Sequence, residues 1–214
     1  MRKAAIVKLL VVACAVATCL MLGACGSSTE VKSDPVAATV NGAEIKESAV
    51  TEQVEGLRQQ LVLTEDEAWG QWLGANAYTP QIVRQTVIDA LVSNELLKQG
   101  AAEKGVDVSD DDVASYFEEI KSSYDSDDLW NQELESSGMS EDQYRESIKA
   151  SLLRDAVTAT FDPAGEDEQS QLERSQAFDQ WLGDLESSAD VKVSDMPDGL
   201  SYAIDMTQYS KAAE

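Results

Sequence analysis

The side chains that could carry chemistry in this sequence are thiols and carboxylates, because its 214 residues include 40 Asp and Glu, three Cys and no His. Without an imidazole there is no Ser-His-Asp or Cys-His arrangement and no histidine ligand for zinc. The acidic runs at 109–112 and 125–128 lack the spaced oxygens and central glycine of a calcium loop. Carboxylate-pair chemistry stays formally open, but solvated acidic faces and helix caps are the interpretation that we favour. We therefore predict no catalytic residue, no metal and no cofactor.

Cys25 is the thiol whose sequence context has a chemical meaning. Three basic residues within the first eight precede an apolar run, residues 9–22, which leads into Gly23-Ala24-Cys25. A basic start followed by a short apolar run is typical of a secretory signal. The small-residue pair before the cysteine resembles the lipobox of bacterial lipoproteins, which implies removal of residues 1–24, lipidation of Cys25 and attachment to the extracytoplasmic face of the cell membrane. The alternative is an uncleaved membrane helix, although the run is shorter than the ~20 residues that a spanning helix needs.

The mature chain that this cleavage would leave is strongly acidic. The leader takes three of the 16 basic residues and none of the acidic ones, so 13 Lys and Arg remain against 40 Asp and Glu, a formal charge of −27. Such a surface repels nucleic-acid phosphates and anionic lipid headgroups, so we expect no nucleic-acid partner and membrane contact only through the lipid. Cys14 and Cys19 leave with the leader, which excludes a disulfide within the mature chain.

The first ordered element is predicted to be a β-hairpin. Residues 25–35 are small, polar and aperiodic, which indicates a flexible tether. Two short strand-like segments then follow at 37–40 and 43–45. Asn41-Gly42 joins them, and this dipeptide is typical of a two-residue hairpin turn.

The rest of the sequence predicts helices, so the expected fold class is mainly α with a small hairpin. Apolar residues recur at helical spacing after the hairpin, and short capping patterns mark where helices begin or end. Capping boxes or N-caps are predicted at Thr64–Glu67, Thr79–Pro80, Ser109–Asp112 and Ser140–Gln143, and a helix end at Gly138. The Thr79–Pro80 helix is expected to continue to about Lys104.

The C-terminal quarter predicts a return to β structure. A break at 162–165 precedes a last helix, and residues 190–193 alternate as a short strand that we expect to pair with the hairpin. Residues 194–214 form an acidic tail in which apolar residues alternate from Leu200 to Met206. This alternation indicates an extended segment against the fold, while a strand, a cleft plug or a disordered end are the alternatives.

The order of these elements resembles the chaperone module of the SurA/PrsA family of extracytoplasmic folding factors. The resemblance covers residues 36–193 and is carried by the hairpin and by the segments 78–113, 137–157 and 178–193. In that family the N-terminal helices and the C-terminal helix and strand fold together, with parvulin prolyl-isomerase domains inserted between them. Here the insertion point falls near 161–170, which is far shorter than the ~50 residues that a domain needs. The resemblance therefore implies a chaperone domain without its isomerase, and not an enzyme.

The function that this resemblance implies is noncovalent. A concave, partly apolar helical surface would bind unfolded or newly exported polypeptides and suppress their aggregation, and the negative charge would favour basic or charge-balanced clients. The candidate client-binding residues are Trp69, Trp72, Tyr78, Trp130 and Met139, because they lie in or beside short segments and loops. Core packing is the alternative for each of them. A lipoprotein scaffold that docks one folded cell-envelope partner, and a prolyl isomerase by family association only, remain alternative functions.

Overall fold

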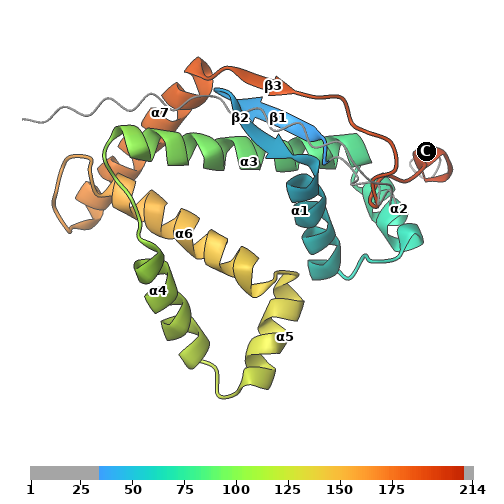
Figure 1. Cartoon of the computed structure of the whole chain (residues 1–214), viewed down its shortest axis with the longest axis horizontal. Coiled ribbons are helices and arrows are strands. Elements are labelled where there is room, and N and C mark those ends of the chain that lie inside the picture. Colours follow the sequence, from blue (N-terminus) through green and yellow to red (C-terminus); the bar gives the residue numbers. More distant parts are fainter. Residues whose placement is uncertain (1–33, 210–214) are drawn as a thin grey trace, which may run out of the picture. The chain divides into compact units, whose positions relative to one another are not determined.

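The computed structural model describes residues 34–209, which contain seven α-helices and one three-stranded antiparallel sheet (Figure 1). The strands are β1 (Val36–Val40), β2 (Ala43–Lys46) and β3 (Val191–Val193). The helices are α1 (Glu47–Gln60), α2 (Asp66–Ala75), α3 (Pro80–Glu103), α4 (Asp110–Ser122), α5 (Asp127–Ser137), α6 (Glu141–Thr158) and α7 (Glu168–Ser188), and a 3-10 turn, η1, spans Met206–Gln208. The predicted mainly α fold with a small hairpin is confirmed. None of the described helices is long and apolar enough to cross a membrane.

The sheet joins the first and the last predicted strands. Its order is β2-β1-β3, and both pairings are antiparallel. Asn41 and Gly42 turn the hairpin with φ values of 52° and 90°, and a two-residue turn of this kind needs both values to be positive. On the other side of β1, Ala38 lies opposite Val193 and Val40 opposite Val191. The expected pairing of the hairpin with the C-terminal strand is therefore confirmed.

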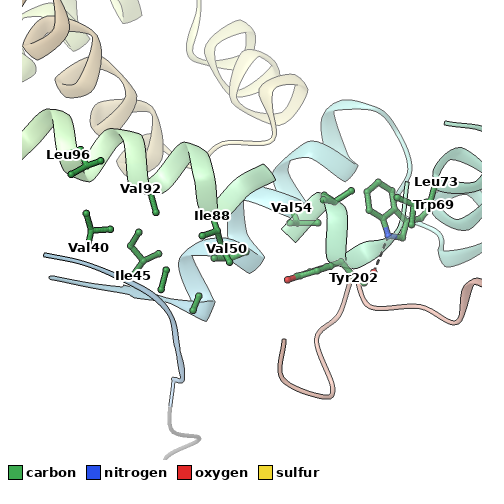
Figure 2. Packing of buried hydrophobic residues seen from close by; sticks show 13 residues of the cluster. Val40, Ile45, Val50, Val54, Trp69, Leu73, Ile88, Val92, Leu96 and Tyr202 are labelled. Carbon is green, nitrogen blue, oxygen red and sulfur yellow. Dashed lines mark hydrogen bonds between the residues drawn. The ribbon is translucent and has the colours of Figure 1, made fainter. Parts of the chain in front are cut away.

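A first hydrophobic cluster lies between the sheet, α1, α2 and the part of α3 up to Leu96 (Figure 2). Val40 of β1, Val50 and Val54 of α1, Trp69 of α2 and Ile88 of α3 are all completely buried in it. The spacing of four residues between Val50 and Val54 places them on one face of α1. This cluster holds the hairpin, α1 and α2 against α3.

A second hydrophobic cluster is built from the end of α3 and from α4 to α7. Phe117, Trp130, Val157 and Phe178 are at most 2 % exposed within it. Helix α3 serves both clusters, because its buried residues up to Leu96 belong to the first and those from Leu97 onward to the second. This 24-residue helix is therefore the common wall of the two cores.

Most of the predicted helix caps form, and their geometry explains where the helices begin. The Thr79 hydroxyl accepts the Ile82 N–H at 3.2 Å at the start of α3. Ser140 and Gln143 make a complete capping box at α6, since each side chain accepts the backbone N–H of the other residue. At α4 the Ser109 hydroxyl accepts the Asp112 N–H and donates to the Asp112 carboxylate. In a full capping box that carboxylate would instead accept the backbone N–H of the N-cap residue.

The capping box predicted at Thr64 is wrong. Helix α2 begins at Asp66, its N-cap is Glu65, and no side chain caps it. The reason is Arg58, whose guanidinium donates to the carbonyl oxygens of Leu63 (3.1 Å) and Thr64 (2.7 Å) and so holds these residues in a loop. A side chain eight residues before the helix therefore fixes its start.

Both boundary segments of the predicted domain are tied to the fold. Asp34 and Pro35, expected in the tether, are fixed because Asp34 accepts the Ser48 N–H and O–H and Pro35 accepts the Glu47 N–H. Beyond β3, Tyr202 is completely buried in the first cluster. The part of the acidic tail up to residue 209 therefore packs with the domain. Cys25 and the predicted leader lie outside the described residues.

Candidate functional site

Three aromatic side chains around α2 form a row from the core to the surface. The rings of Trp69 and Trp72 stack with their centroids 5.3 Å apart and their planes 9° apart, and Tyr78 follows at 5.6 Å from Trp72. Trp69 is completely buried, Trp72 is half-buried, and Tyr78 is 43 % exposed. The spacing of three residues puts both tryptophans on one face of α2. An exposed aromatic surface is thus backed by a rigid stack that continues into the core.

Arg58 of α1 contacts the buried end of this aromatic row. Its guanidinium lies 5.6 Å from the centroid of the Trp69 ring, and it also pairs with Glu55 and Asp66. These contacts satisfy a cation that is only 4 % exposed. They also hold the loop after α1, where Val62 is 83 % exposed and adopts a positive φ of 57°, an uncommon conformation for a β-branched residue.

Ile82 is an exposed apolar residue that the sequence analysis missed. It lies in the first turn of α3 and is 44 % exposed. The buried stripe of α3 runs through Arg84, Ile88, Val92 and Leu96 at steps of four residues, and Ile82 falls outside it. The spacing alone could therefore have identified Ile82 as a surface residue.

Trp130 has a structural role in the second cluster. It is 1 % exposed, and the rings of Phe117, Tyr124 and Tyr144 contact it edge-on, with centroids 5.1–5.4 Å from the centroid of the Trp130 ring. Phe117 and Tyr144 also contact each other edge-on. Its Nε1–H donates to Glu141 at 2.8 Å. The Lys121 ammonium, and then this indole N–H, hold the pKa of Glu141 below its ordinary value, because both favour the ionised carboxylate.

Met139 lines a surface pocket where α1 meets the α5–α6 loop. The pocket has a volume of about 350 Å³, and its lining includes the apolar Leu134 and Met139 and the acidic Glu52, Glu55 and Glu135. Met139 is 38 % exposed. The pocket combines apolar and anionic groups, a lining that suits the stem and cation of a basic side chain.

Two glycines set how closely α1 and the α5–α6 loop approach beside this pocket. A Cβ atom built on Gly138 would lie 2.5 Å from the carbonyl oxygen of Gly56, so no larger residue fits without movement. Gly138 also has a φ of 65°, which favours glycine. The contact therefore depends on glycine at position 138.

A buried polar network joins the start of α1, α3 and the C-terminal segment. Arg84 and Glu47 form a two-pronged ion pair (Nη2–Oε2 2.7 Å, Nε–Oε1 3.0 Å), Arg84 donates to the Ser194 carbonyl, and the Tyr202 hydroxyl donates to Glu47 at 3.2 Å. The hydrogen bonds that Arg84 donates to Glu47 raise the pKa of Arg84, and burial, followed by the Glu47 charge, raises the pKa of Tyr202. Arg84 therefore stays charged and Tyr202 stays neutral at any physiological pH.

No group of three or more Cys, His, Asp or Glu residues within 34–209 is arranged to hold a metal ion.

Comparison with the families of known proteins matches residues 1–158 to the SurA-like N-terminal domain, which is most of the chain. The chain belongs to this family. A search of curated proteins finds no significant match.

The SurA-like N-terminal domain places the chain in a chaperone-type family, as the order of its elements predicted. It is the family that the comparison finds, and no parvulin domain is detected. The matched stretch ends at the last residue of α6. Residues 159–167 connect α6 directly to α7, which returns to pack on α3 and α6 before β3 joins β1. The C-terminal helix and strand therefore complete the fold of the matched part.

The structure separates the five predicted client-binding residues of this SurA-like domain. Trp69 and Trp130 are core residues, so the expectation that they lie on the surface is wrong. Each indole fills a hydrophobic cluster and donates to another group of the domain, the Tyr202 carbonyl or the Glu141 carboxylate. Trp72 is half-buried, and Tyr78 and Met139 are exposed. Trp72 and Tyr78 lie together beside α2, whereas Met139 lies at the α5–α6 loop. Client contact by these three residues stays a prediction.

Proposed function

We propose that this protein is a membrane-anchored extracytoplasmic chaperone, which holds unfolded segments of exported polypeptides without covalent chemistry. The observation that carries the proposal is its membership of the SurA-like family, a chaperone-type family. The exposed apolar side chains support it, because Tyr78, Ile82 and Val62, in the loops on either side of α2 and the first turn of α3, are 43–83 % exposed. Surface apolar groups on a rigid support can bind unfolded chains that expose apolar residues of their own.

The proposed mechanism needs binding only. Holding a client lowers the concentration of free aggregation-prone chain, and no nucleotide or cofactor is required for that. Client binding at Tyr78 costs little conformational entropy, because the stacked rings of Trp72 and Trp69 already hold its surroundings in place. The acidic composition, 40 Asp and Glu against 16 Lys and Arg, favours basic or charge-balanced clients.

Lipidation of Cys25 would supply the membrane anchor. A diacylated cysteine carries two acyl chains, which suffice for stable attachment where one chain is marginal. The segment 26–33 would then separate the lipid from the first residue of the described domain. Clients leaving the export machinery would meet the chaperone at the membrane surface.

Light scattering tests the proposal directly. The protein at a near-stoichiometric ratio should suppress the aggregation of a heat-denatured model client without ATP. Tyr78→Ser combined with Ile82→Ser should weaken suppression, whereas Leu172→Ser, a matched change at a 52 % exposed residue of α7, should not. Aggregation that continues unchanged at a severalfold excess of protein would refute client holding.

Two further measurements separate the alternative functions. Crosslinking in cells should yield many unfolded clients, and one stoichiometric folded partner would instead indicate a scaffold. A proline-peptide assay should show no catalysed isomerisation, and catalysis would instead indicate an isomerase. Neither result depends on the choice of model client.

A further inference from the structure

Residues 195–209, here called the tail segment, cover the first cluster with side chains. Leu200, Ile204 and Met206 are half-buried against the cluster and Tyr202 is completely buried, whereas the residues between them are exposed. The backbone hydrogen bonds of the segment are local, such as those from Ala203 to Leu200 and from Tyr209 to Met206. An alternating row of apolar side chains, and not a β-ladder, therefore attaches this segment.

The surface under the tail segment is formed by one face of α2 and by acidic residues of α1. The Trp69 Nε1–H donates to the Tyr202 carbonyl at 3.1 Å (Figure 2), and the Ser201 hydroxyl donates to Glu55 at 2.6 Å. The Tyr209 side chain lies against Gly70 and Gly74, which the spacing of four residues puts on the same face of α2. We call Glu47, Glu55, Trp69, Gly70 and Gly74 the tail-binding surface.

The charged groups of this surface would keep a partner if the tail segment left, whereas the Trp69 Nε1–H would lose its acceptor, the Tyr202 carbonyl. Two hydrogen bonds join Glu47 to Arg84, so Glu47 keeps this partner when it loses its second one, the Tyr202 hydroxyl. Glu55 likewise keeps Arg58 when it loses Ser201. Departure of the segment therefore exposes mainly apolar area and two glycines that leave room for another chain.

The charge of the tail segment opposes its binding to the rest of the chain. It carries Asp195, Asp198 and Asp205 and no basic residue, and it lies on a chain whose formal charge is −24. Its Ser201 hydroxyl bonds Glu55, which is paired with Arg58, so the repulsion comes from the net charge of the chain and not from this contact. A neutral or basic segment with the same apolar alternation would bind without this repulsion.

We propose that the tail segment is an intramolecular occupant of a polypeptide-binding surface, and that extended, neutral or basic client segments with apolar residues at alternate positions displace it. This inference rests on the proposed function, since it names the site and the kind of client segment. The tail lies outside residues 1–158, the stretch that matches the family, while its binding surface lies within that stretch.

A disulfide that reversibly fixes the tail segment to α2, here called the lock, tests the proposal. A Cβ atom on Gly74 would lie 3.3 Å from the Cβ of Tyr209, close to the separation that a disulfide bridges. It would also lie 2.8 Å from the Tyr209 carbonyl oxygen, so the end of the tail segment must shift slightly in the oxidised and the reduced form alike. Gly74→Cys with Tyr209→Cys, in a full-length chain whose Cys14, Cys19 and Cys25 are replaced by Ser, is purified in mild detergent and compared in its oxidised and reduced forms. The single variants, treated identically, cannot lock and serve as controls, and circular dichroism checks that both forms are folded.

The probe is a fluorescein-labelled peptide with the sequence of residues 196–209 in which Asp198 and Asp205 are replaced by Lys. Its anisotropy should report binding at least about tenfold tighter to the reduced form than to the oxidised form, because the lock removes the binding-competent state. Suppression of client aggregation should weaken in parallel.

The outcomes separate this inference from the proposed function. Equal peptide binding and equal client holding by the two forms would overturn the tail-binding surface and leave the chaperone proposal intact. Peptide binding that is lost on oxidation, in a protein that does not suppress aggregation, would support the surface and refute client holding. Failure of the reduced form to bind the peptide would refute the inference, whatever the client assay shows.

Discussion

Replacing Arg84 with Met should destabilise the protein strongly, because it removes the cation from the buried network and keeps most of the side-chain length. Arg84 is 4 % exposed and Glu47 2 % exposed, so the change leaves a carboxylate in the core with the Tyr202 hydroxyl as its remaining donor. Removing one partner of a buried pair costs about 3–5 kcal/mol, and the retained hydroxyl places the expected loss near the lower limit, ~3 kcal/mol. At about 2–4 °C per kcal/mol for a chain of this size, the melting temperature should fall by roughly 6–12 °C.

The assay is urea unfolding followed by tryptophan fluorescence, with thermal circular dichroism as a second probe. Glu47→Leu combined with Arg84→Met should cost less than the Arg84 change alone, because no unpaired charge remains buried. Lys149→Met is the matched control, since it breaks an ion pair whose partner, Asp110, is 94 % exposed, and it should leave the midpoint unchanged. A loss below ~1 kcal/mol for Arg84→Met, or a double variant no better than the single one, would refute the argument.

Three further perturbations have defined outcomes. Because the pKa of Glu141 is lowered in the folded state, its contribution to stability is present above the ordinary value of 4.5 and is lost as the pH falls through the folded value, so Glu141→Gln should flatten the pH dependence of the urea midpoint in acid. Gly138→Val should cost about 1–3 kcal/mol in the same assay, through its φ and the close Gly56 carbonyl, whereas Gly183→Ala, where nothing lies within 4 Å, should not destabilise. Cys25→Ser should move the protein from the membrane to the soluble fraction without changing its circular dichroism, and unchanged attachment would favour the uncleaved helix.

Local signals predicted the elements whose cause is local. Asn41-Gly42 set the hairpin, and the Ser140–Gln143 pattern set the start of α6, because the groups that stabilise each feature lie within four residues of one another. The Thr64 pattern failed for the opposite reason. The carbonyl of Thr64 is held by Arg58, and the capping pattern contains no information about that side chain.

The burial of the candidate aromatic residues depends on segments that are distant in the sequence. Trp69 and Trp72 lie three residues apart on a short helix, and either could have faced the core. The hydrogen bond from Trp69 to Tyr202, 133 residues away, is one reason why Trp69 is the residue that is buried. Spacing within α2 cannot reveal a contact of that range, whereas the exposure of Ile82 follows from the stripe of α3 itself.

The position of β1 in the middle of the sheet has a consequence for the order of folding. One edge of β1 pairs with β2 as soon as the hairpin has been synthesised, but the other edge pairs Ala38 with Val193 near the far end of the chain. Contacts of such long range form late, after contacts between elements that are closer in the sequence, such as α4 and α6. During vectorial synthesis the N-terminal strand therefore keeps an open edge until residues 191–193 emerge. A nascent chain of this protein is thus itself an incomplete β-sheet for most of its synthesis.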